Sequence, residues 1–269
     1  MAQIVSITNQ KGGVGKTTTA INLAAALSVA EHRVLLVDGD PQGNSTSGIG
    51  VERVEASIYD VLLGSELPSN VIHRAVHFPS LDVLPATPDL AGAEIELVDR
   101  PFRETILRDA LNQVRGQYDF IIVDCPPSLG LLTVNMLSAA DGLLIPLQCE
   151  YFALEGVSQL LKTVQLVQEG PNSLLKIFGI LLTMYDPRLN LSRQVAADAR
   201  AYFGELMFAT VIPRNIRLAE APSFGRSIIQ YDISSAGASA YLALAQEFTS
   251  RIETNVFTNH ALTNGSRSL

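Results

Sequence analysis

Two lysines, Lys11 and Lys16, stand on either side of three glycines near the start of the chain, in the stretch QKGGVGKTTT of residues 10–19. Backbone N–H groups in a glycine-rich turn can point at phosphate oxygens, and a helix that begins there adds its partial positive charge. A lysine after the last glycine can reach the β- and γ-phosphates of a nucleotide, and the next hydroxyl can bind Mg²⁺. The predicted phosphate-binding groups are Gly13, Val14, Gly15, Lys16, Thr17 and Thr18, with Thr17 as the magnesium ligand.

The second lysine departs from the standard nucleotide-binding loop. The pattern G-x-x-x-x-G-K-[ST] needs glycine at position 10, where this chain has Gln10, and Lys11 follows directly. The dinucleotide pattern G-x-G-x-x-G also fails, because Thr18 stands in the place of its third glycine. Since one lysine suffices to reach the phosphates, Lys11 is either a solvated lysine at the loop entrance or a group with a second task.

Carboxylates follow two other apolar runs. Asp124 ends the run DFIIVD of residues 119–124, a common place for the aspartate that holds Mg²⁺ through a water molecule. Asp40 follows the run RVLLVD of residues 33–38. It could position a water molecule in line with the γ-phosphate or help to organise the metal shell, and the alternative is that it only caps the following turn.

These groups must be positioned by an alternation of strands and helices. Such an alternation, with nearly continuous apolar strands, predicts an α/β fold with a doubly wound, mostly parallel sheet and helices on both faces. The expected strands are 4–8, 33–38, 81–86, 119–124, 142–148, 176–185 and 208–213, and the expected helices are 17–30, 57–64, 89–98, 101–115, 131–140, 154–168, 192–203 and 234–252. We expect one domain over residues 1–254 and a mobile polar tail over 255–269.

Composition narrows the possible partners. The chain has 269 residues, of which 47% are hydrophobic and 17% charged, with a net charge of −8. An acidic protein does not attract nucleic acid as a whole, so any DNA binding would need a local basic patch. No apolar stretch approaches the ~18 residues of a membrane span, and no signal peptide precedes the first strand. Cys125 and Cys149 lie in apolar runs, as reduced thiols of a cytosolic protein do.

Five blocks of the sequence carry a family resemblance: KGGVGKTT, LLVDGDPQGN, FIIVDCPPSLG, PLQCEYFALEG and VIPRNIRLAEAPSFGRSI. Together they resemble the ParA/Soj group of chromosome and plasmid partition ATPases, over residues 3 to about 250. This group belongs to the P-loop NTPases with a deviant Walker A motif, named for the extra lysine.

The resemblance implies a cycle. Members bind ATP and Mg²⁺, form a sandwich dimer with nucleotides at the interface, and then bind DNA without sequence preference. A ParB-type centromere-binding protein stimulates an otherwise slow ATP hydrolysis and so releases the ATPase from DNA. The resemblance therefore implies a cytoplasmic, nucleoid-associated homodimer that has no membrane partner.

Carried over to this sequence, the resemblance also assigns residues. Lys11 would contact the nucleotide of the other subunit, and Gly12 would sit at the dimer contact, where a residue without Cβ is needed. Asp40 would position the hydrolytic water. Pro213 and Asn215, in IPRN, match the stretch that contacts adenine. Gly39 departs from the family, which more often has a larger apolar residue there.

DNA binding would require positive charge, and one segment provides it. Residues 186–230 hold six arginines and four carboxylates, a net charge of +2, so the rest of the chain carries −10. Arg188 and Arg217 match the family's DNA-contact positions, and Arg193 and Arg200, on one expected helix, are secondary candidates. The alternative is that these arginines pair with local acids on a solvated face.

Other functions remain open at this stage. Relatives use the same ATPase to position carboxysomes, chemotaxis arrays or other protein cargo on the nucleoid, and this chain alone hardly distinguishes them. A MinD-type membrane-cycling ATPase would need a basic amphipathic helix at the end, where this chain has NVFTNHALTNGSRSL. A nitrogenase iron-protein relative would need paired cluster cysteines, and His73 and His77 in HRAVH lack the glutamate of a metalloprotease motif.

Overall fold

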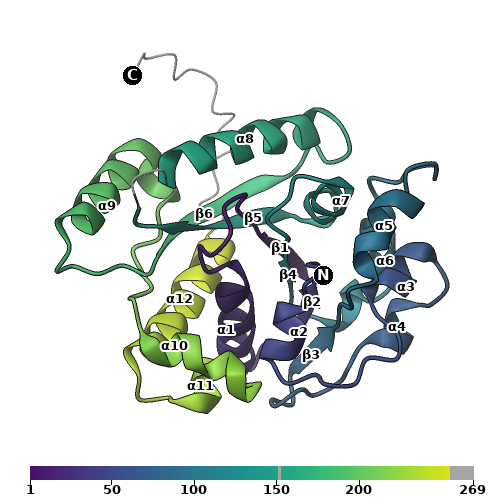
Figure 1. Ribbon diagram of the computed structural model, residues 1–269, viewed down its shortest axis with the longest axis horizontal. Helices are drawn as coiled ribbons and strands as arrows, with labels where there is room; N and C mark the ends of the chain where they lie inside the picture. Colours follow the sequence, from purple (N-terminus) through teal and green to yellow (C-terminus); the bar gives the residue numbers. More distant parts are fainter. Residues whose placement is uncertain (151–152, 255–269) are drawn as a thin grey trace.

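A six-stranded sheet forms the centre of the computed structural model, which describes residues 1–150 and 153–254 (Figure 1). The strand order is β3-β2-β4-β1-β5-β6, and every pairing is parallel. The strands are β1 (Gln3–Ile7), β2 (Val34–Asp38), β3 (Leu81–Leu84), β4 (Phe120–Asp124), β5 (Gly142–Gln148) and β6 (Lys176–Thr183). The predicted α/β fold with a parallel sheet is confirmed.

The register of the central strands brings three strand ends together. Ile7 at the end of β1 and Asp38 at the end of β2 both pair with Asp124 at the end of β4. The chain leaves β1 toward β2 on one side and leaves β4 toward β5 on the other, so the strand order reverses between β1 and β4. Ligands of open α/β sheets bind in the crevice outside the carboxyl ends of the strands at such a reversal.

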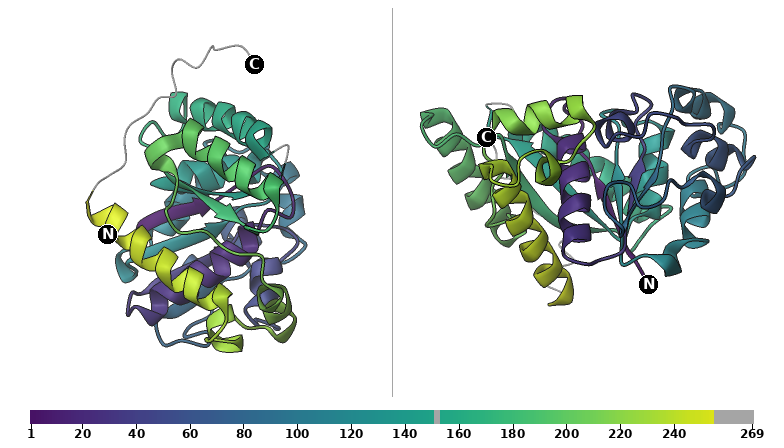
Figure 2. Two further views of the ribbon diagram at one scale, coloured as in Figure 1. Left: turned by 90° about the vertical axis from the view of Figure 1, so that its left-hand side faces the viewer. Right: turned by 90° about the horizontal axis from the view of Figure 1, so that it is seen from below.

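Helices cover both faces of the sheet (Figure 2). One face packs against α1 (Lys16–Val29), α2 (Asn44–Gly48), α10 (Ile216–Glu220), α11 (Ile228–Tyr231) and α12 (Ala236–Glu253). The other packs against α3 (Ile58–Leu63), α4 (Pro68–Val71), α5 (Leu90–Glu96), α6 (Ile106–Asn112), α7 (Leu131–Ala139), α8 (Ala153–Glu169) and α9 (Asn190–Phe203). Because both faces are buried, most strands are nearly continuous apolar runs instead of alternating.

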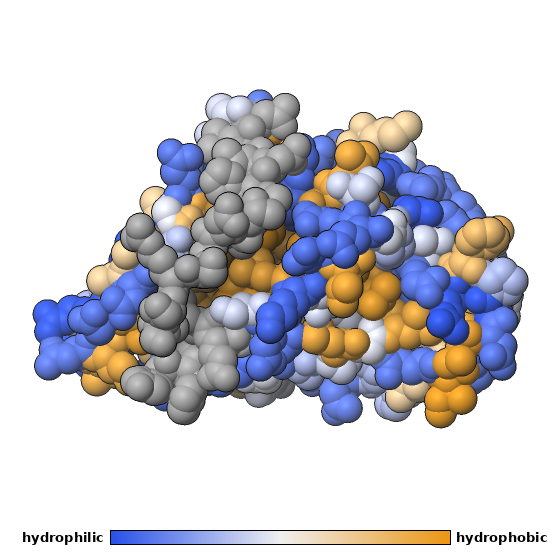
Figure 3. Space-filling model, turned by 90° about the horizontal axis from the view of Figure 1, so that it is seen from above, coloured by the Kyte–Doolittle hydropathy of each residue, from blue (hydrophilic) through white to orange (hydrophobic). Residues whose placement is uncertain are grey.

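The helix α8 shows how the sequence pattern produces this packing. Val157, Leu160, Val164 and Val167 recur at helical spacing and are buried against the sheet. The intervening residues Gln159, Lys162 and Gln165 are polar. Seen from the α8 side, hydrophobic residues form separate patches between hydrophilic ones (Figure 3).

Two local predictions are wrong. Residues 208–213 form no strand: Met207 and Pro213 make only isolated bridges, to Ile180 and Tyr185. The segment follows the edge of β6, but Pro213 has no N–H with which to continue a ladder. The helix expected over 101–115 begins only at Ile106, because Pro101 and Phe102 form turns and Phe102 has a φ of +56°.

None of the helices within the described residues is long and apolar enough to cross a membrane. The single-domain boundary at residue 254 stays a prediction, and the predicted tail of residues 255–269 lies outside the described residues.

Candidate nucleotide-binding site

The glycine-rich loop joins β1 to α1 at the carboxyl edge of the sheet. Gly13 and Gly15 have φ values of +76° and +89°, a conformation that residues with a Cβ rarely adopt. Gly15 is the N-cap of α1, and no side chain caps that end of the helix. The first N–H groups of α1 are therefore available to an anion, as the sequence predicts.

Lys16 lies inside the loop. The residue is only 7% exposed, and its Nζ donates to the carbonyl oxygen of Lys11 at 3.2 Å. Burial lowers the pKa of Lys16, while the negative charges of Asp124 and Asp40 oppose this shift. A phosphate at the loop would provide the closer negative charge that this buried ammonium lacks.

Three carboxylates meet beside this lysine. Asp38 and Asp124 are fully buried, and Asp40 is nearly so. Burial raises the pKa of Asp124, and repulsion from Asp38 raises it further, while the hydroxyls of Ser45 and Thr17 lower it. Burial likewise raises the pKa of Asp38. The carboxylates therefore form a buried cluster whose mutual repulsion a bound cation would reduce.

The donor set at this cluster suits Mg²⁺. Asp124 Oδ2 accepts from Ser45 Oγ at 2.7 Å, whereas its Oδ1 is buried without a hydrogen-bond partner among the described residues. The hydroxyl of Thr17 lies close enough to influence Asp124. Within the described residues, no three His, Cys, Asp or Glu side chains could hold a metal together. Mg²⁺ usually keeps several waters and binds one or two carboxylates plus phosphates, so one free oxygen is sufficient.

Asp40 has a structural role as well as its predicted chemical one. Its Oδ1 accepts from the backbone N–H of Gln42 at 3.0 Å, and its carbonyl accepts from Gly43 at 2.9 Å. The side chain thus does cap the following turn, which was the alternative that the sequence left open. A carboxylate has several lone pairs, so this bond leaves acceptor capacity for a water molecule.

Sequence reasoning missed the residues that hold the Asp40 turn in place. Asp38 Oδ2 accepts from the backbone N–H and the hydroxyl of Thr46, each at 2.7 Å, and Asp38 Oδ1 accepts from the N–H of Asp40 at 3.2 Å. Thr46 Oγ1 in turn accepts from the N–H of Ala86. The hydroxyl-rich stretch NSTS after Gly43 was the available signal.

A cavity of about 340 Å³ adjoins the end of the loop. It is bounded by Gly15 and Thr18 on the loop side and by Pro213 and Asn215 on the other, so the structure brings these four residues to one cavity. Thr183, Met184, Ile212, Leu218 and Tyr241 also line it, and the sequence did not identify them. A cavity of this size, mostly apolar with few polar groups, suits a nucleobase and its sugar.

Neighbouring strands fix the loop. Thr183 Oγ1, at the end of β6, donates to the carbonyl of Val14 at 2.8 Å. Asn9 donates to Pro146 in β5 at 2.8 Å, and its Oδ1 accepts from the backbone N–H of Lys11 at 3.1 Å. The loop is thus held from the two strands that follow the strand-order reversal.

Lys11 contacts a side chain outside its own phosphate loop. Its Nζ lies 2.5 Å from Glu150 Oε2, and both side chains are partly exposed. Gly12 is exposed, and a Cβ on it would meet no atom within 4 Å. Nothing within the described chain therefore requires glycine at position 12.

Gly39, the departure from the family pattern, has a local explanation. A Cβ at this position would lie 2.1 Å from Met136 Cε and 2.8 Å from the carbonyl oxygen of Asp124. The Met136 side chain fills the space that a larger residue at 39 would need.

The predicted DNA-contact arginines are exposed but paired. Arg188, with 86% of its side chain exposed, contacts Asp186 at 2.7 Å. Arg217, with 54% exposed, contacts Glu220 at 2.9 Å and Asp232 at 3.6 Å. The bridge between Tyr185 and Pro213 brings their two segments side by side. Arg193 and Arg200 are exposed on α9, where Arg193 donates to Asn190.

The remaining candidates for metal or cluster chemistry are structural. Cys125 and Cys149 are buried, and burial raises the pKa of Cys125 to about 12. His77 Nε2 bonds to the carbonyl of Gly225, and His73 pairs through its backbone with Val83.

Comparison with known proteins agrees with this site. A family model described as an AAA domain matches residues 2–177. The chain is 57% identical to the sporulation initiation inhibitor protein Soj of Bacillus subtilis, covering 92% of this chain and 98% of that one. It is 55% identical to the chromosome partitioning protein ParA of Myxococcus xanthus, covering 93% and 89%.

A solved structure gives the same picture of the fold. Cobyrinic acid a,c-diamide synthase from Mycobacterium smegmatis, with bound ADP and magnesium, superposes with a TM-score of 0.82 at 40% identity, over 95% of this chain and 97% of that one. The family model and the identity to Soj and ParA over most of the chain show that the chain belongs to the ParA/Soj family of chromosome-partitioning P-loop ATPases.

Proposed function

We propose that this ATPase segregates DNA through an ATP-dependent dimer that binds DNA without sequence preference and is released when a ParB-type partner stimulates hydrolysis. The observation that supports this most directly is that the two lysines of the loop lie in different environments. Lys16 is buried in its own phosphate loop, and Lys11 leaves the same loop to reach Glu150 at the surface.

The nucleotide would be ATP with Mg²⁺. The N–H groups of Gly13 to Thr18 and the ammonium of Lys16 would hold the phosphates, and the cavity at Pro213 and Asn215 would hold the base. Thr17 would bind Mg²⁺ directly and Asp124 through water. The metal supplies charge neutralisation at the β- and γ-phosphates.

Dimerisation would complete the catalytic site. Phosphoryl transfer benefits from a positive group supplied by a second subunit. Releasing Lys11 for this role would cost little, because its only ion pair within the described chain is a half-exposed one. The open space around Gly12 would accept the backbone of a partner subunit.

Releasing Lys11 from Glu150 should favour the dimer. We expect Glu150→Gln to strengthen ATP-dependent dimerisation by a few-fold, because a half-exposed ion pair contributes about 0.2–1 kcal/mol in each subunit. Sedimentation velocity with a non-hydrolysable ATP analogue measures the effect. Glu52→Gln, at an exposed glutamate in an unrelated loop, is the control. A dimerisation constant that Glu150→Gln leaves unchanged or weakens would contradict this role.

DNA binding would use Arg188 and Arg217 from both subunits. In the single chain each is paired with carboxylates of its own surface, which reduces its attraction for phosphate. A dimer doubles the number of arginines on one face, so ATP binding and DNA binding would be coupled.

The experiment that tests this function measures DNA binding as a function of salt. With about four phosphates neutralised per dimer, log K should fall with log salt with a slope of about −3 to −4, and only with ATP. Arg217→Ala should flatten the slope by about 2, whereas Glu220→Gln should tighten binding a few-fold by freeing Arg217. Arg53→Ala is the control outside the basic segment. ATP-independent binding, or an unchanged slope in Arg217→Ala, would refute the proposed surface.

A further inference from the structure

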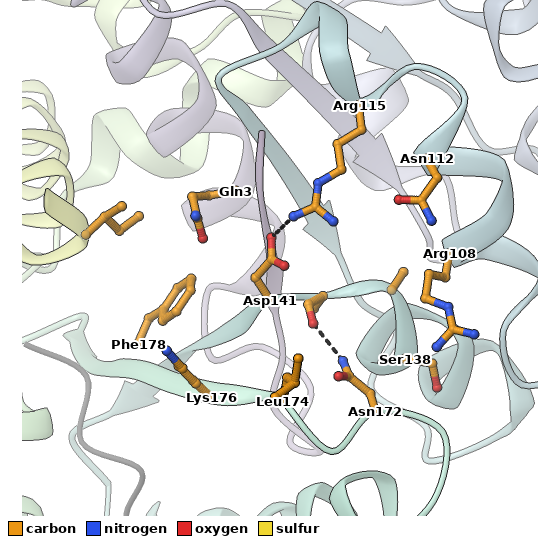
Figure 4. A pocket seen from close by; sticks show the side chains of 13 residues that line it. Gln3, Arg108, Asn112, Arg115, Ser138, Asp141, Asn172, Leu174, Lys176 and Phe178 are labelled. Carbon is orange, nitrogen blue, oxygen red and sulfur yellow. Dashed lines mark hydrogen bonds and ion pairs between the residues drawn. The ribbon is translucent and has the colours of Figure 1, made fainter. Parts of the chain in front are cut away.

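A second cavity lies at the opposite edge of the sheet, where the strands begin (Figure 4). Its volume is about 350 Å³. Gln3 of β1 and Lys176 of β6 mark its position at the amino ends of the strands, so it is separate from the phosphate loop. Nothing in the proposed ATPase cycle uses it.

The charged side chains that line this cavity are mainly cationic. Arg108, Arg115 and Lys176 line it together with one carboxylate, that of Asp141. Arg115 Nη2 contacts Asp141 Oδ2 at 2.6 Å, and Arg108 Nε lies 3.8 Å from Oδ1 of Asp109, an exposed carboxylate that is not part of the lining. Arg108 also donates to the carbonyl of Pro171 through Nη1, so its Nη2 can still donate to a ligand.

Ser138 supplies a second, independent observation. It is 1% exposed and lines the cavity, and its Oγ has no hydrogen-bond partner among the described residues. A buried hydroxyl without a partner costs about 1–3 kcal/mol, so such groups are rare and a ligand is one explanation. Arg108 on α6 and Ser138 on α7 come from two helices that pack together, and Figure 4 draws both side chains on the same side of the cavity.

Two carbonyls at the end of α7 are already hydrogen-bonded. Asn172 Nδ2 donates to the carbonyls of Leu137 and Ala140, at 3.0 and 2.7 Å. These acceptors are therefore satisfied, and the partial negative charge of this helix end is partly neutralised.

We propose that this cavity binds a small phosphorylated compound that carries an apolar or aromatic group. The phosphate would lie between Arg108 and Ser138, because a guanidinium and a hydroxyl together match its oxygens. Phe178, Leu174 and Ile252 form the apolar part of the lining and would contact the rest of the compound.

The test uses the full chain saturated with ADP and Mg²⁺, so that the phosphate loop is filled. Phenyl phosphate is titrated by calorimetry, with inorganic phosphate as the probe without an apolar group and with ionic strength held constant. We expect saturable binding of phenyl phosphate at one site per chain, tighter than that of inorganic phosphate. Ser138→Ala should weaken it several-fold and Arg108→Gln about tenfold, as loss of a hydrogen bond to a charged group predicts.

Lys162→Gln, on the outer side of α8, is the matched control and should bind as the unmodified chain does. Ser138→Ala removes an unpartnered hydroxyl and therefore keeps the fold intact. No saturable binding, equal affinity for the two probes, or normal binding by both cavity variants would each overturn the proposal. These outcomes are independent of ATPase activity and DNA binding.

Discussion

Lys16→Ala is expected to abolish ATP binding, whereas Lys11→Ala keeps it and loses the dimer. Lys16 is buried beside the phosphate position, so its removal deletes about two charge-assisted hydrogen bonds, worth roughly 3 kcal/mol or more, and weakens ATP at least about 100-fold. Lys11 reaches outward to Glu150 in the single chain, and its removal should change ATP affinity by less than about threefold.

The two variants need three measurements each: ATP affinity by calorimetry, dimerisation by sedimentation with a non-hydrolysable analogue, and steady-state hydrolysis. Lys162→Ala serves as a control for loss of a surface lysine. Equal loss of ATP affinity in both variants would show that Lys11 is a second ligand of its own nucleotide. Normal dimerisation and hydrolysis by Lys11→Ala would leave Lys11 as the solvated lysine that the sequence also allowed.

The phosphate loop and the sheet could be predicted because their signals are local. Each signal is contained in a few consecutive residues: the glycines stand directly before Lys16, and the apolar runs stand directly before Asp38 and Asp124. Parallel strands end at the same edge of a sheet, so Asp38 and Asp124 could be expected at that edge, where the structure pairs them. Local patterns of this kind suffice for the fold class and the place of the site.

The pairing of side chains could not be predicted. Glu150 lies 139 positions after Lys11, and no sequence pattern in either segment predicts their contact. The same holds for the hydrogen bond from the Thr183 hydroxyl to the Val14 carbonyl and for that from the Ser45 hydroxyl to Asp124. The expected strand at 208–213 failed for a related reason, since its apolar residues pack at the edge of β6 without forming a ladder. Tertiary contacts decided these features, and local propensity did not.

Asp40 is the residue whose replacement should affect the chemistry itself. If it positions the attacking water, Asp40→Asn should lower hydrolysis by about 100-fold or more, which is the usual contribution of a positioned base. Asparagine keeps the oxygen that accepts from the N–H of Gln42, so the turn should survive. ATP affinity should change little, because Mg²⁺ would depend on Thr17 and Asp124 instead.

The combination of readouts separates the two roles of Asp40. Slow hydrolysis with normal ATP binding should let dimers accumulate and remain on DNA, measured as a slower off-rate after ATP is removed. Asp40→Ala should do the same but also lower the melting temperature, since it removes the cap on Gln42. Normal hydrolysis by Asp40→Asn together with a destabilised Asp40→Ala would assign Asp40 to the turn alone. In that case the carboxylate that orients water must be sought elsewhere, because Asp38 is already occupied by Thr46 and the Asp40 backbone.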